Sequence, residues 1–192
     1  MRGLFSFARE EEQVITGQRT YLRAPRLSDQ AEWTALRQRS RAFLEKWEPT
    51  WQPDEFSRAA FRFRLRVYSQ RARDDQSYTF FIFNRQTHAM IGGLSMSHVR
   101  RGVSQSATLG YWMGLPFAGQ GYMKDALLAV IAAAYPLFGL HRLEAACIPH
   151  NDRSRKLLLA CGFDQEGYAR SYVKIAGRWE DHLLFGRSVD EA

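Results

Sequence analysis

The sequence has few cysteines and no long apolar run. Cys147 and Cys161 follow no paired spacing, which argues against a disulfide framework and a cysteine-based metal site. The longest apolar run, 126–135, is about half the length of a membrane-spanning helix. The first ten residues turn acidic before any apolar stretch, unlike a secretory signal peptide. We therefore expect a cytoplasmic protein with no membrane partner and no metal.

Two familiar phosphate-binding patterns are also absent. Residues 109–128 predict a strand that stops before Pro116, then Gly119 and Gly121, then a long apolar helix. A dinucleotide fingerprint would need a third glycine at Lys124, and a P-loop would need Gly-Lys-Ser/Thr. The glycines still let a ligand approach the first helix amides, which carry the positive end of the helix dipole. The pattern predicts a phosphate or pyrophosphate site, with an ordinary strand–helix turn as the alternative.

Length and charge place further bounds. The 192 residues, 45% of them hydrophobic, are enough for one domain with a sizeable core. We expect a single domain over 1–192, with an irregular arm at 1–17. The net charge of +7 favours an anionic ligand, an RNA-rich neighbourhood, or both.

The order of the predicted elements indicates an α/β fold, specifically an α+β sandwich built on a mixed sheet. A strand at 20–25 precedes a helix with Ser28 as its N-cap and Trp33 and Leu36 on its inner face. An aromatic loop at 43–51 leads to a helix at 57–73. Further strands are expected at 78–83, 90–98, 104–113 and 141–148, then a helix at 151–162 and a hairpin at 172–185.

The predicted helix 57–73 carries arginines at every fourth position: Arg58, Arg62 and Arg66. Phe61, Leu65 and Tyr68 fall on another face, which we expect to be buried. An arginine face of this kind suits RNA phosphates, and it equally suits a solvated surface. The sequence leaves both interpretations open.

Two motifs carry a resemblance to a known family. Gly119-Gln-Gly-Tyr122 after a strand resembles the coenzyme loop of the GNAT acetyltransferases, although Ala118 and Met123 depart from its pattern at both ends. Asn151-x-x-Ser154, followed by Gly162-Phe163, resembles the RimJ/RimL branch of that family. The likeness spans roughly 20–185 and is nearest to RimJ-type members, through the segments 43–49, 99–102, 149–151, 163–168 and 177–182.

The resemblance implies a GNAT fold with a mixed, mostly antiparallel sheet of six or seven strands, flanked by helices and splayed at the coenzyme site. Acetyl-coenzyme A would be the cosubstrate, and Ser154 would face its thioester sulfur. The implied coenzyme-binding residues are Trp112, Met113, Gly119, Gln120, Gly121, Tyr122, Met123 and Asn151. The implied acceptor is the N-terminal α-amine of a ribosomal protein, the alanine of S5 above all.

The chemistry needs a proton for the departing thiolate and a modest base for the amine. Ser154, at a helix N-terminus, is the predicted acid. Glu48 in the aromatic loop is the first candidate base, and Asp75 is the second. A cysteine nucleophile is disfavoured because neither cysteine adjoins an obvious base. Two alternatives remain open: a GNAT enzyme acting on another amine, and a non-catalytic RNA- or ribosome-binding module.

Overall fold

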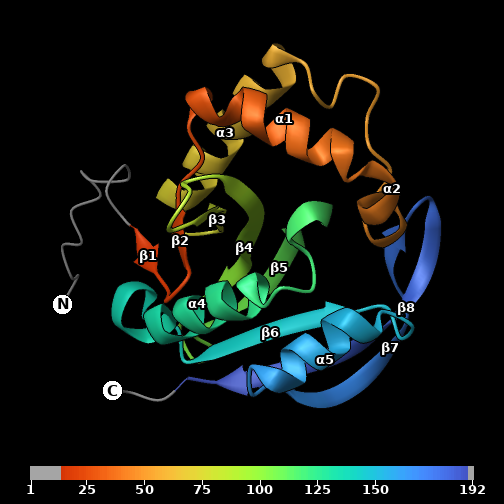
Figure 1. Ribbon diagram of the computed structural model, residues 1–192. Helices are drawn as coiled ribbons and strands as arrows, with labels where there is room; N and C mark the ends of the chain where they lie inside the picture. The colour runs from red at the N-terminus through yellow and green to blue at the C-terminus, as the bar shows by residue number, and fades with distance from the viewer. Residues whose placement is uncertain (1–13, 190–192) are drawn as a thin grey trace.

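The computed structural model describes residues 14–189, and Figure 1 shows one open sheet with helices on both faces. Of the arm expected at 1–17, residues 1–13 lie outside the described range, and Ile15–Thr16 form a short edge strand instead. No helix of the described residues has the length and apolar character that crossing a membrane requires.

The sheet has eight strands, so the expected six or seven was too few. Their order is β1-β2-β3-β4-β5-β6-β8-β7, and within the described chain only β5 and β6 run parallel. The strand missing from the prediction is the short β1 at one edge of the sheet, because the sequence there shows no strand pattern. The strands are β1 (Ile15–Thr16), β2 (Thr20–Arg23), β3 (Tyr78–Asn84), β4 (Met90–Arg100), β5 (Ser106–Met113), β6 (Arg142–Cys147), β7 (Asp164–Ile175) and β8 (Arg178–Ser188).

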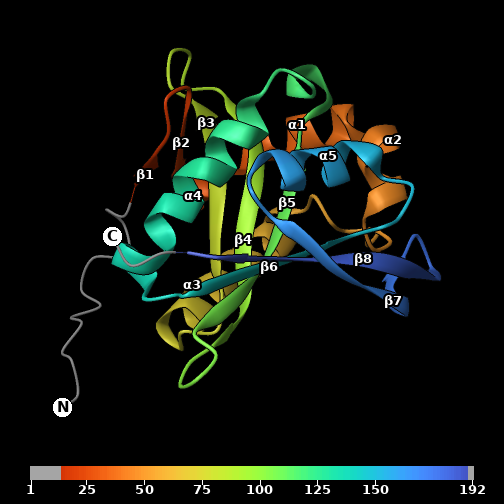
Figure 2. The ribbon, with the colours of Figure 1, turned by 90° about the horizontal axis from the view of Figure 1, so that it is seen from below.

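The long helices lie in pairs on the two faces of the sheet, as the two views in Figures 1 and 2 show. Helices α1 (Gln30–Arg39) and α3 (Arg58–Arg73) lie on one face, and α4 (Tyr122–Phe138) and α5 (Asp152–Ala160) lie on the other. The larger apolar core forms beneath α4, whose predicted inner stripe is buried: Met123, Ala126, Leu127, Val130 and Ala134. A smaller core around Trp33 and Phe61 lies beneath α1 and α3.

Two local predictions need correction. Ser28 is not an N-cap, because a 3-10 turn, η1 (Leu27–Asp29), precedes α1 and puts Asp29 at the cap position. Asp29 is buried there and pairs with Arg23 at 2.7 Å, which fixes the entry of the chain into α1. The aromatic segment 43–51 is partly helical, with α2 (Arg41–Leu44) and η2 (Glu45–Trp47), because the carbonyl of Ser40 accepts the amides of Phe43 and Leu44.

A single carboxylate ties the beginning of β2 to the beginning of α4. Asp125, in the first turn of α4, accepts hydrogen bonds from the amides of Gln18, Arg19 and Thr20 at 2.9–3.0 Å. It also accepts the Thr20 hydroxyl at 2.7 Å. Charge-assisted bonds of this kind are the stronger class in proteins. The first turn of α4 is therefore fixed against the sheet edge.

Candidate active site

The loop between β5 and α4 presents a row of free amides. A short 3-10 turn, η3 (Leu115–Phe117), follows β5, and Gly119 and Gly121 then adopt φ of +76° and +83°. This left-handed conformation favours glycine, and it turns the chain into α4. The amides of residues 119–124 donate to no described residue, while the Asp125 amide begins the helix by bonding the Gly121 carbonyl. An anion is the ligand such a row accommodates.

The flanks of this loop are held by two side chains. Gln120 donates its amide to the Pro116 carbonyl at 2.7 Å, which closes the loop on itself. Arg19 donates to the Gln120 carbonyl at 2.8 Å, and its guanidinium lies 4.2 Å from the centre of the Tyr122 ring. Arg19 therefore adds a positive charge beside the free amides, which strengthens the case for an anionic ligand.

Beside the loop, β5 and β6 part. Their parallel ladder runs only from Ser106–Arg142 to Leu109–Ala145, although both strands continue. The far sides of the two strands stay paired, β5 with β4 as far as Met113 and β6 with β8 as far as Cys147. Each strand thus ends with unpaired backbone groups facing its former neighbour. An extended ligand bearing amides can bond to these groups as a strand would.

Ser154 lies at the edge of this opening. The side chain of Asn151 caps α5 by accepting the Ser154 amide at 3.2 Å, as predicted from its position. The Ser154 hydroxyl is 2.7 Å from the Tyr111 hydroxyl, which reaches across from β5. Burial raises the pKa of Tyr111, so this phenol stays protonated at neutral pH. The two hydroxyls form a short chain that ends in the opening.

The cysteines do not provide a nucleophile. Both are buried and free. Burial raises the pKa of the Cys147 thiol despite its contact with the Ser154 hydroxyl, and burial likewise raises the pKa of Cys161. A thiol held protonated is a poor nucleophile. Among the described residues, no group of histidine, cysteine and acidic side chains is arranged to hold a metal ion.

Glu48 is bound within an aromatic cluster. Its two oxygens accept from Arg37 at 2.8 and 2.7 Å, and one also accepts the indole N–H of Trp51 at 2.8 Å. The Arg37 guanidinium lies 4.3 Å from the Trp51 ring and 5.0 Å from Trp112 on β5. The Glu48 carbonyl accepts the amide of Ala176, at the tip of the β7–β8 hairpin. Glu48 therefore joins the aromatic segment to the sheet, and its role as a base stays a prediction.

Asp75, the second candidate base, lies toward the opposite end of β5, near Ser106. Its carboxylate binds the Arg101 guanidinium at 2.6 Å and the Tyr78 hydroxyl at 2.7 Å. Burial alone would raise the pKa of Asp75, but the bonds from Arg101 and Tyr78 outweigh burial and lower it. Its position and its ion pair both separate it from the opening.

The structure therefore gathers most of the predicted site in one place. Trp112 and Met113 end β5, the glycine loop follows, and Asn151 and Ser154 begin α5 across the opening. Sequence reasoning missed Tyr111 and Arg37. Arg37 follows Trp33 by four residues, so it falls on the buried stripe of α1. A charged residue at such a position is the sequence signal that indicates a buried ion pair.

Comparison with known proteins agrees with this geometry. The model of the acetyltransferase (GNAT) domain family matches residues 19–164. A probable N-acetyltransferase of Bacillus subtilis, YjcK, is 34% identical over 89% of this chain and 94% of its own length. The ribosomal protein uS5-alanine N-acetyltransferase of Escherichia coli is 34% identical over 76% of this chain and 75% of its own. The solved structure of Mycobacterium smegmatis RimJ in complex with a CoA-disulfide superposes with a TM-score of 0.84 at 30% identity, over 92% of this chain and 84% of that one.

The Arg37–Glu48 pair should be costly to break. Arg37 is 7% exposed, so Glu48→Ala leaves a buried cation unpaired, and we expect a loss of about 3–5 kcal/mol of folding free energy. Urea unfolding measures it. The matched control is Glu45→Ala, which removes an exposed i,i+4 pair with Arg41 and should cost under about 0.5 kcal/mol. Equal losses in the two variants would contradict the structural role of Glu48.

Proposed function

This chain belongs to the GNAT acetyltransferase family, and we propose that it acetylates the N-terminal α-amine of a ribosomal protein, the alanine of S5 above all. It is an N-acetyltransferase that uses acetyl-coenzyme A. The observation that supports the proposal most is the opening between β5 and β6, which ends in the free amides of residues 119–124. The acceptor is suggested by the relatives, one of which is a uS5-alanine N-acetyltransferase.

We place the coenzyme along the opening. The pyrophosphate lies on the amides between β5 and α4, with Arg19 beside it. The pantetheine arm bonds to the unpaired backbone of β5, as an added strand would. Asn151 uses its oxygen to cap α5, which leaves its amide nitrogen free to donate to the pantetheine. The residues assigned to the coenzyme are Trp112, Met113, Gly119, Gln120, Gly121, Tyr122, Met123 and Asn151.

The reaction suits an α-amine better than a lysine. An α-amine titrates near pH 8 and a lysine amine near 10.4, so neutralising the lysine costs about 3 kcal/mol more. The neutral amine attacks the thioester carbonyl, and a backbone amide at the end of β5 meets the developing oxyanion. As the carbon–sulfur bond breaks, Ser154 gives its proton to the sulfur. The Tyr111 hydroxyl is 2.7 Å away, and we infer that it is the donor to Ser154, which leaves the serine proton directed into the opening.

The walls of the acceptor side are aromatic and rigid. Trp112, Trp51 and the Arg37–Glu48 pair form one wall, and the β7–β8 hairpin tip is bonded to the Glu48 carbonyl. Trp47 packs on His150, whose ring centre is 5.6 Å away, just before α5. We propose that these side chains wall a narrow slot, which admits the end of a chain more readily than a side chain on a folded surface.

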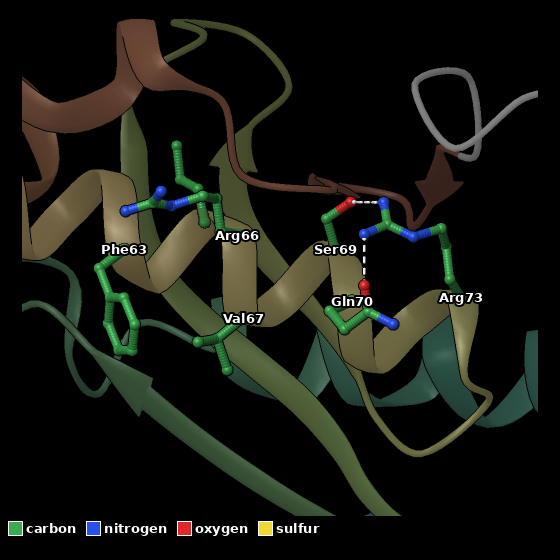
Figure 3. A pocket seen from close by; sticks show the side chains of 7 residues that line it. Phe63, Arg66, Val67, Ser69, Gln70 and Arg73 are labelled. Carbon is green, nitrogen blue, oxygen red and sulfur yellow. Dashed lines mark hydrogen bonds between the residues drawn. The ribbon is translucent and has the colours of Figure 1, made fainter.

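We also infer that the outer face of α3 contacts RNA near the acceptor. The helix has six arginines and no acidic residue, and Arg58, Arg62 and Arg66 are all exposed. Phe63, 62% exposed, lies beside Arg66 along a hollow of about 660 Å³ on this helix (Figure 3). Cations that bind phosphates, interleaved with an aromatic ring that stacks on a base, are typical of single-stranded RNA sites.

The first prediction concerns the coenzyme loop. Gly121→Glu places a carboxylate among the amides that hold the pyrophosphate, so coenzyme affinity measured by calorimetry should fall by more than tenfold. Gly102→Glu is the control, because Gly102 has a similar φ of +65° at a distant turn with open space around it. Unchanged affinity in a folded Gly121→Glu protein would move the pyrophosphate site elsewhere.

The second concerns the hydroxyl chain. Ser154→Ala should lower kcat by about ten- to a hundredfold with little change in acceptor KM, because the proton is needed only in the transition state. Tyr111→Phe should lower kcat in the wild type and have no further effect in Ser154→Ala. Additive losses in the double variant would show that the two hydroxyls act independently.

The third tests the acceptor. A peptide that begins with alanine and has blocked lysines should be acetylated, and an N-formylated peptide with a free lysine should not. Mass spectrometry locates the acetyl group. Preference for the free lysine would reject the α-amine and leave only the acetyltransferase class.

The fourth tests the α3 face. The triple variant Arg58→Gln/Arg62→Gln/Arg66→Gln should bind a ribosomal RNA fragment more weakly and with a shallower salt dependence, while its kcat on the free peptide stays unchanged. Arg170→Gln, an exposed cation on β7, is the control. Equal RNA binding by the wild type and the triple variant would show that these arginines form a solvated surface and do not bind RNA.

A further inference from the structure

The reaction needs a group that takes a proton from the attacking nitrogen, and this group must lie on the acceptor side. Ser154 and Tyr111 serve the sulfur from the face covered by α4 and α5, since Tyr111 packs against the larger core. The next residue, Trp112, points to the opposite face and packs beneath α1. The proposed acceptor walls, Trp51 and Trp112 around Arg37, lie on that second face, so the amine is taken to arrive from there. A base is therefore to be sought among the side chains on the side of Trp112.

His182 on β8 occupies this face next to the opening. Leu183 is paired with Cys147, the last residue of β6, and packs against the core beneath α4 and α5. Because side chains alternate along a strand, His182 points the other way, toward the face of Trp112. Cys147 in turn contacts the Ser154 hydroxyl. His182 and Ser154 thus lie at the same level of the sheet, on its two opposite faces.

The ring of His182 is oriented for proton transfer. It is 5% exposed, and its Nδ1 lies 3.0 Å from the Glu180 carbonyl. A carbonyl only accepts, so Nδ1 carries the hydrogen and Nε2 keeps a lone pair. Among the described residues, the buried side-chain nitrogens and oxygens without a partner are Thr34 Oγ1, Arg37 Nε and Arg64 Nε. Among the same residues Nε2 of His182 has no hydrogen-bond partner, so its lone pair is available.

The surroundings of His182 hold the ring without occupying Nε2. The Tyr172 ring lies edge-on with its centre 5.6 Å away. Asp181, the neighbouring acid, points to the other face and binds the Tyr168 hydroxyl and the Ser171 amide. By contrast, both oxygens of Glu48 already accept bonds from Arg37 and Trp51. His182 is therefore the better placed of the two bases.

We propose that His182 is the general base of this enzyme, a role that rests on the proposed acylation of an amine. As the amine nitrogen bonds to the thioester carbon, Nε2 of His182 takes one of its protons. The carbon–sulfur bond breaks with its electron pair on sulfur, which gains a proton through Ser154. One proton has left nitrogen and one has reached sulfur. The imidazolium then returns its proton to solvent, and the Ser154–Tyr111 hydroxyl chain is reprotonated.

The test measures turnover of the alanine peptide and coenzyme affinity in the same proteins. His182→Gln keeps a polar side chain of similar size but removes the base. We expect kcat to fall by about a hundredfold with acceptor KM and coenzyme affinity unchanged. In His182→Ala, added imidazole should restore at least a tenth of the lost rate. His141→Ala is the control, since this exposed histidine precedes β6 at the paired end of the β5–β6 ladder, away from the opening, and should show neither loss nor rescue.

Two results would overturn the assignment. One is a His182→Gln kcat within threefold of the wild type, and the other is a large loss in His182→Ala that imidazole does not restore. The proposed acceptor is judged separately, by whether the wild type acetylates the alanine peptide or the lysine peptide. If the lysine peptide is the substrate, the α-amine is rejected as the acceptor. The kcat ratio of wild type to His182→Gln and the imidazole rescue of His182→Ala are then measured on the lysine peptide instead.

Discussion

The early end of the ladder between β5 and β6 is the constraint on which the site depends. Two parallel strands that separate after Leu109 and Ala145 leave backbone groups unpaired inside a sheet, which is costly unless a ligand or water bonds to them. The neighbouring ladders hold each strand in place as far as Met113 and Cys147. The opening is therefore built into the sheet before any substrate binds. The glycine loop and the first turn of α5 then lie on the two sides of the opening.

Local sequence signals predicted those parts of the site that depend on a few adjacent residues. Gly119 and Gly121 take the left-handed conformation, Asn151 caps α5, and α4 begins directly after the loop. These features follow from short-range chemistry, namely backbone sterics and capping bonds. The same rules failed at Ser28, because Asp29 ends a 3-10 turn there and accepts bonds from Arg23 and the Arg26 amide. Asp29, paired with Arg23 of β2, takes the cap position instead.

Contacts between distant segments could not be predicted from the same signals. The Tyr111–Ser154 bond joins residues 43 positions apart, and the Ala176–Glu48 bond joins a loop to a hairpin tip. Glu48 is the first candidate base from the sequence, whereas its ion pair with Arg37 of α1 is visible only in the structure. The relevance of His182 depends in the same way on which face of β8 it occupies. A residue's chemical role here is set by its place in the sheet, which one sequence does not reveal.

Asp125 links the beginning of β2 to the first turn of α4, two regions that lie far apart in the sequence. One carboxylate in the first turn of α4 accepts three amides before and within β2, and the same turn ends the glycine loop that we propose for the pyrophosphate. If the coenzyme orders this turn, as the proposed site implies, it also orders the β1–β2 edge, and by reciprocity a well-ordered edge favours coenzyme binding by an equal free energy. On the proposed site, the first strands of the chain would then modulate coenzyme affinity, although they are remote from the chemistry.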